Sequence, residues 1–165
     1  MKSVFVKFFI VVLAVAAGIV LALSKRDRRP LGEAPTLNYL SPDMAQLARQ
    51  QFLDGNFTII RDIRLLPWPI LEKFTERNGS RPVIANPGKG FIVGDVIYDS
   101  SVPSERLIFA GVSGEKCFVH YEKGGRGHSY LLVLFDLTPT DVKPLWRGYC
   151  SGPAANIGEL RSDCP

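Results

Sequence analysis

The clearest pattern of apolar and polar positions lies in residues 106–135, where apolar side chains recur at every second position. This period is typical of β-strands, whose successive side chains point to opposite faces of a sheet. Two Gly-containing segments, residues 113–116 and 123–127, interrupt the pattern and fit tight turns. We therefore predict three short antiparallel strands joined by two turns.

One face of this predicted meander is almost purely apolar. In the register that the turns favour, Val112 opposes Cys117, Ile108 opposes Tyr121, and Tyr121 opposes Ser129. The apolar face then comprises Ile108, Ala110, Val112, Cys117, Val119, Tyr121, Leu131, Val133 and Phe135. We expect helices to pack on it and remove it from water. A register slip of one residue would exchange the two faces.

A helix is predicted upstream of the meander, beginning at Ser41-Pro42-Asp43. Serine favours the position before a helix, proline its first turn, and aspartate the positive end of the helix dipole. Apolar residues that follow at helical spacing are expected to face the core, and Gly55 suits the end of the helix. These apolar residues are Met44, Leu47, Ala48 and Phe52.

The remaining segments carry weaker patterns. Residues 56–66 fit a helix or a turn, and two prolines after them predict a further helix over residues 70–77. Trp68, between these prolines, is expected to be a packing anchor. Further along the chain we expect a loop over residues 81–90, strands over 91–98 and 143–149, and a short helix or coil over 153–161.

Helices followed by an antiparallel sheet indicate an α+β fold. We expect two or three helices packed on a meander sheet of four to five strands. Residues 41–165 are expected to form this single globular domain.

The N-terminal segment differs in character, because residues 8–23 contain no charged residue. Counted from residue 4, a helix there would span about 30 Å, the thickness of a bilayer hydrocarbon core. We interpret residues 1–24 as an uncleaved single-pass anchor that contacts the membrane through residues 4–23. A cleaved signal peptide is the alternative, but the basic residues that follow favour a membrane-interface stop. Residues 25–40, basic and then rich in proline and glycine, are expected to be a linker.

Two arguments about the side of the membrane oppose each other. The basic residues after the apolar segment slightly favour a cytoplasmic body by the positive-inside rule. A short tail before a first apolar segment favours export of the body, as in secretory signals. We expect an extracytoplasmic body, which also suits a disulfide near the C-terminus.

The net charge of +4 does not indicate nucleic-acid binding once its location is considered. Six of the 20 basic residues precede Pro30, which leaves 14 basic and 15 acidic residues, a charge of −1, for the rest of the chain. A body without excess positive charge lacks the electrostatic signature of a DNA or RNA binder. Nucleic acid is therefore excluded as an expected partner.

The three cysteines, Cys117, Cys150 and Cys164, allow three alternative single disulfides. Cys150 and Cys164 are close in sequence, and closing their loop would stabilise the fold by on the order of 3 kcal/mol in an oxidising compartment. The alternative is that all three are free and that Cys117 is a small buried hydrophobe.

The second face of the meander holds the candidate site. It comprises Leu107, Phe109, Phe118, His120, Glu122, His128, Tyr130, Leu132 and Leu134, and it becomes polar towards the second turn. There His120, Glu122, His128 and Tyr130 are expected to share a face beside Arg126. Two imidazoles, a carboxylate and a phenol could bind a ligand or a metal, or act in acid–base chemistry. Core packing and a turn are the competing interpretation.

Residues 148–152 match G-x-C-x-G, a cysteine form of the nucleophile elbow, after a predicted strand. An α/β-hydrolase would need a histidine downstream, and none follows in the sequence. A turn, or a disulfide of Cys150 with Cys164, is the preferred interpretation.

These patterns predict a membrane-tethered binding or interaction domain without a cofactor, whose partner is a small ligand or a protein. The alternative is a cleaved, exported domain with hydrolase or metal-dependent activity. No motif identifies the ligand or a reaction.

Overall fold

The computed structural model describes residues 40–75, 83–95, 99, 101–138 and 141–164. The predicted anchor over residues 1–24, and all of the predicted linker except Leu40, lie outside these ranges. Among the helices in the described ranges, none is long and apolar enough to cross a membrane. All other described residues lie within residues 41–165, the range over which a single domain is predicted.

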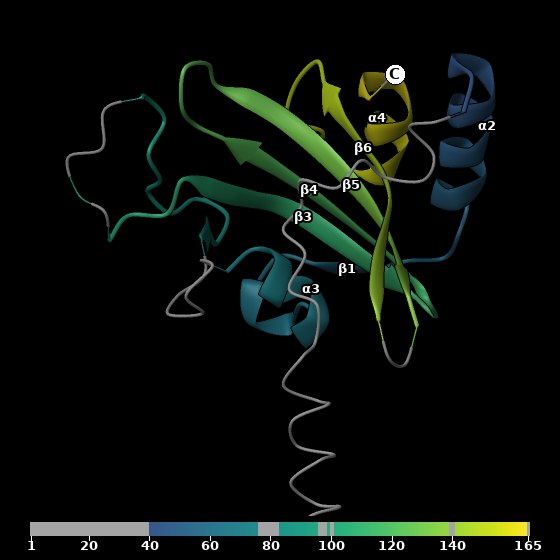
Figure 1. Cartoon of the computed structure of the whole chain (residues 1–165), viewed down its shortest axis with the longest axis horizontal. Coiled ribbons are helices and arrows are strands. Elements are labelled where there is room, and N and C mark those ends of the chain that lie inside the picture. Colours follow the sequence, from purple (N-terminus) through teal and green to yellow (C-terminus); the bar gives the residue numbers. More distant parts are fainter. Residues whose placement is uncertain (1–39, 76–82, 96–98, 100, 139–140, 165) are drawn as a thin grey trace, which may run out of the picture.

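The described residues form a sheet with helices packed on both of its faces (Figure 1). The strands are β1 (Thr58–Ile60), β2 (Ile84–Ala85), β3 (Glu105–Ser113), β4 (Lys116–Lys123), β5 (Ser129–Leu137) and β6 (Val142–Cys150). The helices are α2 (Pro42–Leu53), α3 (Trp68–Lys73) and α4 (Ile157–Asp163), and a short 3-10 helix, η2 (Ile63–Leu65), precedes α3. The predicted α+β class is confirmed.

Strands β3 to β6 form an antiparallel meander, and β1 extends it to give the order β1-β3-β4-β5-β6. Strand β2 pairs in parallel with the start of β3, which brings the sheet to six strands rather than four to five. Strand β1 lies within residues 56–66, where a helix or turn was expected. Its β-branched residues Thr58, Ile59 and Ile60 pair with β3 instead, as their strand propensity favours.

A β-bulge at Ile108 changes the predicted pairing of β3 with β4. Leu107, not Ile108, opposes Tyr121, and Phe109 opposes His120. The extra residue in β3 therefore transfers Leu107 to the predicted apolar face and Ile108, expected on that face, to the opposite core. Beyond the bulge, the predicted pairing of Val112 with Cys117 is confirmed.

The second turn is also displaced from its predicted position. Lys123 opposes Ser129, so the turn covers residues 124–128, and Tyr121 opposes Leu131 rather than Ser129. This shift by two positions leaves every side chain of β5 on its predicted face, because side chains alternate with a period of two.

Both faces of the sheet are buried, whereas the sequence predicted only one. On one face, α3 and η2 cover a core that includes Phe74 and Phe135. On the other face, α2 and α4 cover a second core that includes Phe118 and Leu160. The face expected to turn polar is thus largely apolar, and its buried polar groups need partners within the protein.

Helix α2 begins as predicted, with Ser41 at the N-cap and Pro42 at the first position. Its orientation differs from the prediction, because Met44 and Leu47 are 55% and 49% exposed. The buried residues of the helix are Ala45, Arg49, Phe52 and Leu53. The adjacent large residues at its C-terminal end select this side for burial, and Met44 and Leu47 then face outward.

The prediction that Trp68 is a packing anchor is wrong. Its side chain is 62% exposed, while Ile70 and Phe74 are fully buried. Trp68 precedes Ile70 by two positions, which places it about 200° around the helix, on the solvent side.

Residues 91–95 do not form the predicted strand but lie along the end of the β4–β5 hairpin. The N–H of Ile92 donates to the carbonyl of Pro103 at 2.9 Å, and that of Gly125 donates to the carbonyl of Val93 at 3.0 Å. At Gly124 the hairpin end and residues 91–95 are so close that a Cβ would lie 1.7 Å from the Ile92 carbonyl oxygen. Glycine is therefore required at this position.

The substitution Gly124→Ala should destabilise the domain by roughly 1–3 kcal/mol, because the Ile92 carbonyl would have to move. Gly127→Ala is the matched control in the same turn, since a Cβ there meets nothing within 4 Å. It should change the free energy of unfolding by less than about 0.5 kcal/mol. Urea unfolding measures both effects, and equal stability of the two variants would contradict the close approach.

Candidate functional site

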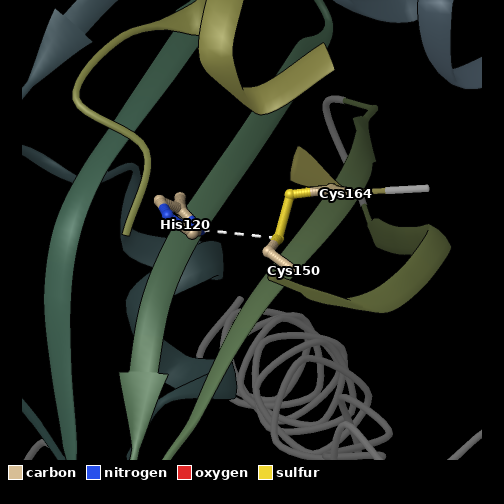
Figure 2. Close-up of side chains that lie close together, drawn as sticks. All are labelled: His120, Cys150 and Cys164. Carbon is tan, nitrogen blue, oxygen red and sulfur yellow. Dashed lines mark hydrogen bonds between the residues drawn. A yellow bond between two sulfur atoms is a disulfide. The ribbon is translucent and has the colours of Figure 1, made fainter. Parts of the chain in front are cut away.

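Three side chains with reactive atoms meet on the face covered by α2 and α4 (Figure 2). They are His120 of β4, Cys150 at the end of β6, and Cys164 after α4. Cys150 and Cys164 form a disulfide, with Cα atoms 4.1 Å apart, which is the pairing that the sequence favoured. One ligating atom from each of the three residues lies within 4.8 Å of the others.

His120 is fully buried and is hydrogen-bonded through both ring nitrogens. Its Nε2 accepts from the N–H of Ala154 at 3.1 Å. Its Nδ1 lies 2.9 Å from the carbonyl oxygen of Leu131 and 3.9 Å from Sγ of Cys150. A nitrogen that accepts from an amide N–H carries no proton, so the ring proton is on Nδ1 and is donated to the carbonyl.

Burial lowers the pKa of His120, and this effect exceeds the opposing hydrogen bond to Leu131 and the charges of Glu122 and Asp163. Because the ordinary pKa is already 6.5, the ring is neutral at pH 7 in the folded protein. His120 is thus a satisfied core histidine, the competing interpretation of the sequence.

The structure places a histidine next to the G-x-C-x-G segment. This residue, His120, lies 30 residues before Cys150, whereas a histidine was expected only after it. The pair is nonetheless not arranged for nucleophilic catalysis. Cys150 has no thiolate while it is bonded to Cys164, and Nδ1 of His120 already carries a proton and cannot accept another. The disulfide also removes both sulfurs as metal ligands, because metals bind thiolates.

A second polar cluster lies near the turn between β4 and β5, around Glu122. One carboxylate oxygen accepts from Nε of Arg106 at 2.5 Å, and the other lies 2.7 Å from Nε2 of His128. The side chain of Glu122 is 8% exposed, against 29% for Arg106 and 34% for His128. Two partners for a buried carboxylate offset much of the cost of removing it from water.

Aromatic rings surround this Glu122 cluster. The ring of His128 lies 4.9 Å from that of Tyr130 and 5.8 Å from that of Phe91. The guanidinium of Arg106 lies 4.5 Å from the centre of the Phe91 ring and donates to the carbonyl of Lys89 at 3.0 Å. These contacts attach residues 89–91 to the sheet.

The five predicted site residues divide into three groups. Glu122, His128 and Tyr130 come together as expected. His120 hydrogen-bonds to backbone groups elsewhere on the sheet and contacts the disulfide rather than this cluster. Arg126 is exposed in the turn and forms no hydrogen bond or ion pair with the rest of the described chain.

Arg106 and Phe91 belong to the Glu122 cluster but were not predicted. Arg106 directly opposes Glu122 across β3 and β4. Opposite charges at facing strand positions can be recognised in a sequence. The predicted register omitted the bulge and therefore placed Leu107, not Arg106, opposite Glu122. Phe91 is far from the hairpin in sequence and gave no such signal.

A buried polar group on the α3 face was also missed. Glu105 lies 3.2 Å from Nζ of Lys123 through one carboxylate oxygen. Its other oxygen is buried and has no hydrogen-bond partner among the described residues, and the buried hydroxyl of Tyr121 lies beside Arg147. Burial raises the pKa of both groups, although Arg147 is close enough to oppose the rise at Tyr121.

Comparison of the chain with models of protein families, with curated proteins and with solved structures gives no significant match. No similarity therefore assigns a role to the disulfide site or to the Glu122 cluster. The function is inferred from the chain's own residues.

The buried His120 should make stability depend on pH. Because its pKa is lowered in the folded state, the unfolded chain binds this proton more tightly. The stability contributed by the neutral ring is complete above pH 6.5 and is lost as pH falls below that value. The slope should reach at most about 1.4 kcal/mol per pH unit.

His120→Gln should remove this slope, whereas His128→Gln, at the other histidine, should keep it. Urea unfolding of both variants between about pH 5 and pH 7.5 measures the effect. An unchanged slope in His120→Gln would assign the pH dependence to another group.

Proposed function

We propose that this chain is a single-pass membrane-tethered domain that binds a ligand or a protein segment on the extracytoplasmic side of the membrane. The observation that supports it most is the Cys150–Cys164 disulfide within the folded domain. Disulfides persist in oxidising compartments and are rare where cellular thiols keep cysteines reduced. Together with the uncharged residues 8–23, the disulfide favours an anchor that leads the body outward.

A binding role is favoured over catalysis because the reactive groups are engaged in holding the fold together. Cys150 is in a disulfide, His120 is bonded to two backbone groups, and Glu122 is paired through both oxygens. The alternative, an exported hydrolase or metal-dependent enzyme, would require reduction of the disulfide and release of the His120 ring.

The binding surface we propose is the exposed edge of the Glu122 cluster together with the turn over residues 124–128. Here His128 and Tyr130 offer partly exposed rings, and Arg126 and Lys89 offer exposed positive charge. Aromatic rings beside cations on a rigid framework suit a partner with a carboxylate or another anionic group.

Thiol counting in the full chain tests the side of the membrane. In denatured protein without reductant, one thiol, that of Cys117, should react with a PEG-maleimide, and all three cysteines should react after reduction. Three reactive thiols before reduction would contradict an oxidising compartment. Carbonate washing should leave the protein in the membrane with residues 1–24 retained, whereas a mature chain that begins near Ser24 would favour the cleaved alternative.

Photocrosslinking in native membranes tests the binding surface. A photoreactive residue at Arg126 should capture a partner, and the same residue at Glu115, an exposed position in the β3–β4 turn, should not. His128→Ala should weaken capture from position 126 by about tenfold, the effect of losing a contact of about 1.4 kcal/mol. Equal capture from both positions would reject the surface.

A further inference from the structure

Helix α2 presents apolar side chains on two sides. Its inner side packs Phe52 and Leu53 into the core shared with α4. On its outer side, Met44 and Leu47 are neighbours on the helix surface and are 55% and 49% exposed. Leu40, just before the helix, is 41% exposed. Figure 1 shows α2 at the edge of the molecule, next to α4.

The outer side of α2 carries a single charge within the helix, that of Asp43. The charged residues of the helix are Asp43, in its first turn, and Arg49. Arg49 is turned inward, where it is 8% exposed and its guanidinium lies 4.5 Å from the centre of the Trp146 ring. The exposed residues within the helix after Asp43 are Met44, Gln46, Leu47, Gln50 and Gln51. Asp43 lies beside Leu47, four positions along the helix. Apart from this carboxylate in the first turn, covering the outer side with an interfacial medium desolvates no ion of the helix.

We propose that the outer side of α2 rests on the membrane surface, with Leu40, Met44 and Leu47 in the headgroup region of the bilayer. This inference rests on the proposed function, in which residues 4–23 form the membrane anchor. The predicted linker over residues 25–40 has only 16 residues. A coil of that length has an average end-to-end distance of about 20 Å, which keeps the start of α2 close to the bilayer. A helix with an exposed apolar stripe and only one exposed charge along its length suits this interface.

The size of the stripe favours a lipid surface over a second copy of the chain. A stable protein interface buries about 800 Å² on each partner, far more than three half-exposed aliphatic side chains supply. A surface already held close by a short tether needs much less contact, because the tether makes docking an intramolecular step with a high effective concentration.

Depth-dependent quenching in the full chain tests this orientation. Met44→Cys and Leu65→Cys are each labelled with the NBD fluorophore and reconstituted into phosphatidylcholine vesicles, with or without dibrominated phosphatidylcholine. Leu65 is the matched control, since it is 68% exposed and lies in η2 on the opposite face of the sheet. The native thiol does not compete, because Cys117 is buried and burial raises its pKa to about 12.

Bromine quenching at residue 44 should exceed that at residue 65 at least about threefold, and Leu47→Cys should behave like Met44→Cys. Equal quenching at residues 44 and 65, in protein that stays with the vesicles, would overturn the inference and leave the tether intact. Release of the protein by carbonate washing would overturn the tether and the inference with it. A blue shift at residue 44 that grows with protein concentration, without bromine quenching, would overturn the inference in favour of contact between copies.

Discussion

The hydrogen bonds of His120 are the interaction on which the C-terminal part of the fold depends. A polar ring in the middle of a buried sheet face is tolerated because both of its nitrogens meet backbone partners, the Leu131 carbonyl and the Ala154 amide. The bond to Ala154 holds the segment between β6 and α4, and the disulfide holds the end of α4 through Cys164. Together they position α4 over the sheet, where Leu160 completes the second core.

Because both faces are buried, every polar side chain of the central strands needs a hydrogen-bond or ion-pair partner within the protein. Glu122 meets this need with two partners, one from the neighbouring strand and one from the turn. Glu105 meets it only in part, with one oxygen near Lys123 and the other unpaired among the described residues. The residues that looked chemically active in the sequence are therefore mainly those that a two-sided sheet has to neutralise. The edge of the Glu122 cluster differs, because the rings of His128 and Tyr130 are still partly accessible there.

Features set by local sequence could be predicted, and features set by distant contacts could not. The start of α2 follows from Ser41 and Pro42, and the alternation of β3 to β5 follows from the pattern of residues 106–135. The bulge at Ile108 leaves no mark in a period-two pattern, so Leu107 was assigned to the wrong face. The orientation of α2 was equally hidden, because two apolar stripes fit the same helix and only the location of the second core selects one.

The candidate site shows the same division. Grouping Glu122 with Tyr130 required only the alternation of two strands, which survives a register shift of two residues, and His128 lies in the turn next to them. The environment of His120 could not be predicted, because it depends on the segment after β6, whose Ala154 contacts His120. No residue close to His120 in the sequence indicates this contact. The disulfide between Cys150 and Cys164 could be anticipated from their spacing alone.

Cys117 lies on the opposite side of the sheet from the disulfide, in the core under α3, whereas Cys150 and Cys164 join under α2 and α4. An unfolded chain with these three cysteines can form any of three bonds. Once β4 has entered the sheet, the sheet itself separates Cys117 from the other two, and the pKa of about 12 leaves almost no thiolate for exchange. In a chain that folds before it is oxidised, the sheet therefore leaves only the Cys150–Cys164 bond to form.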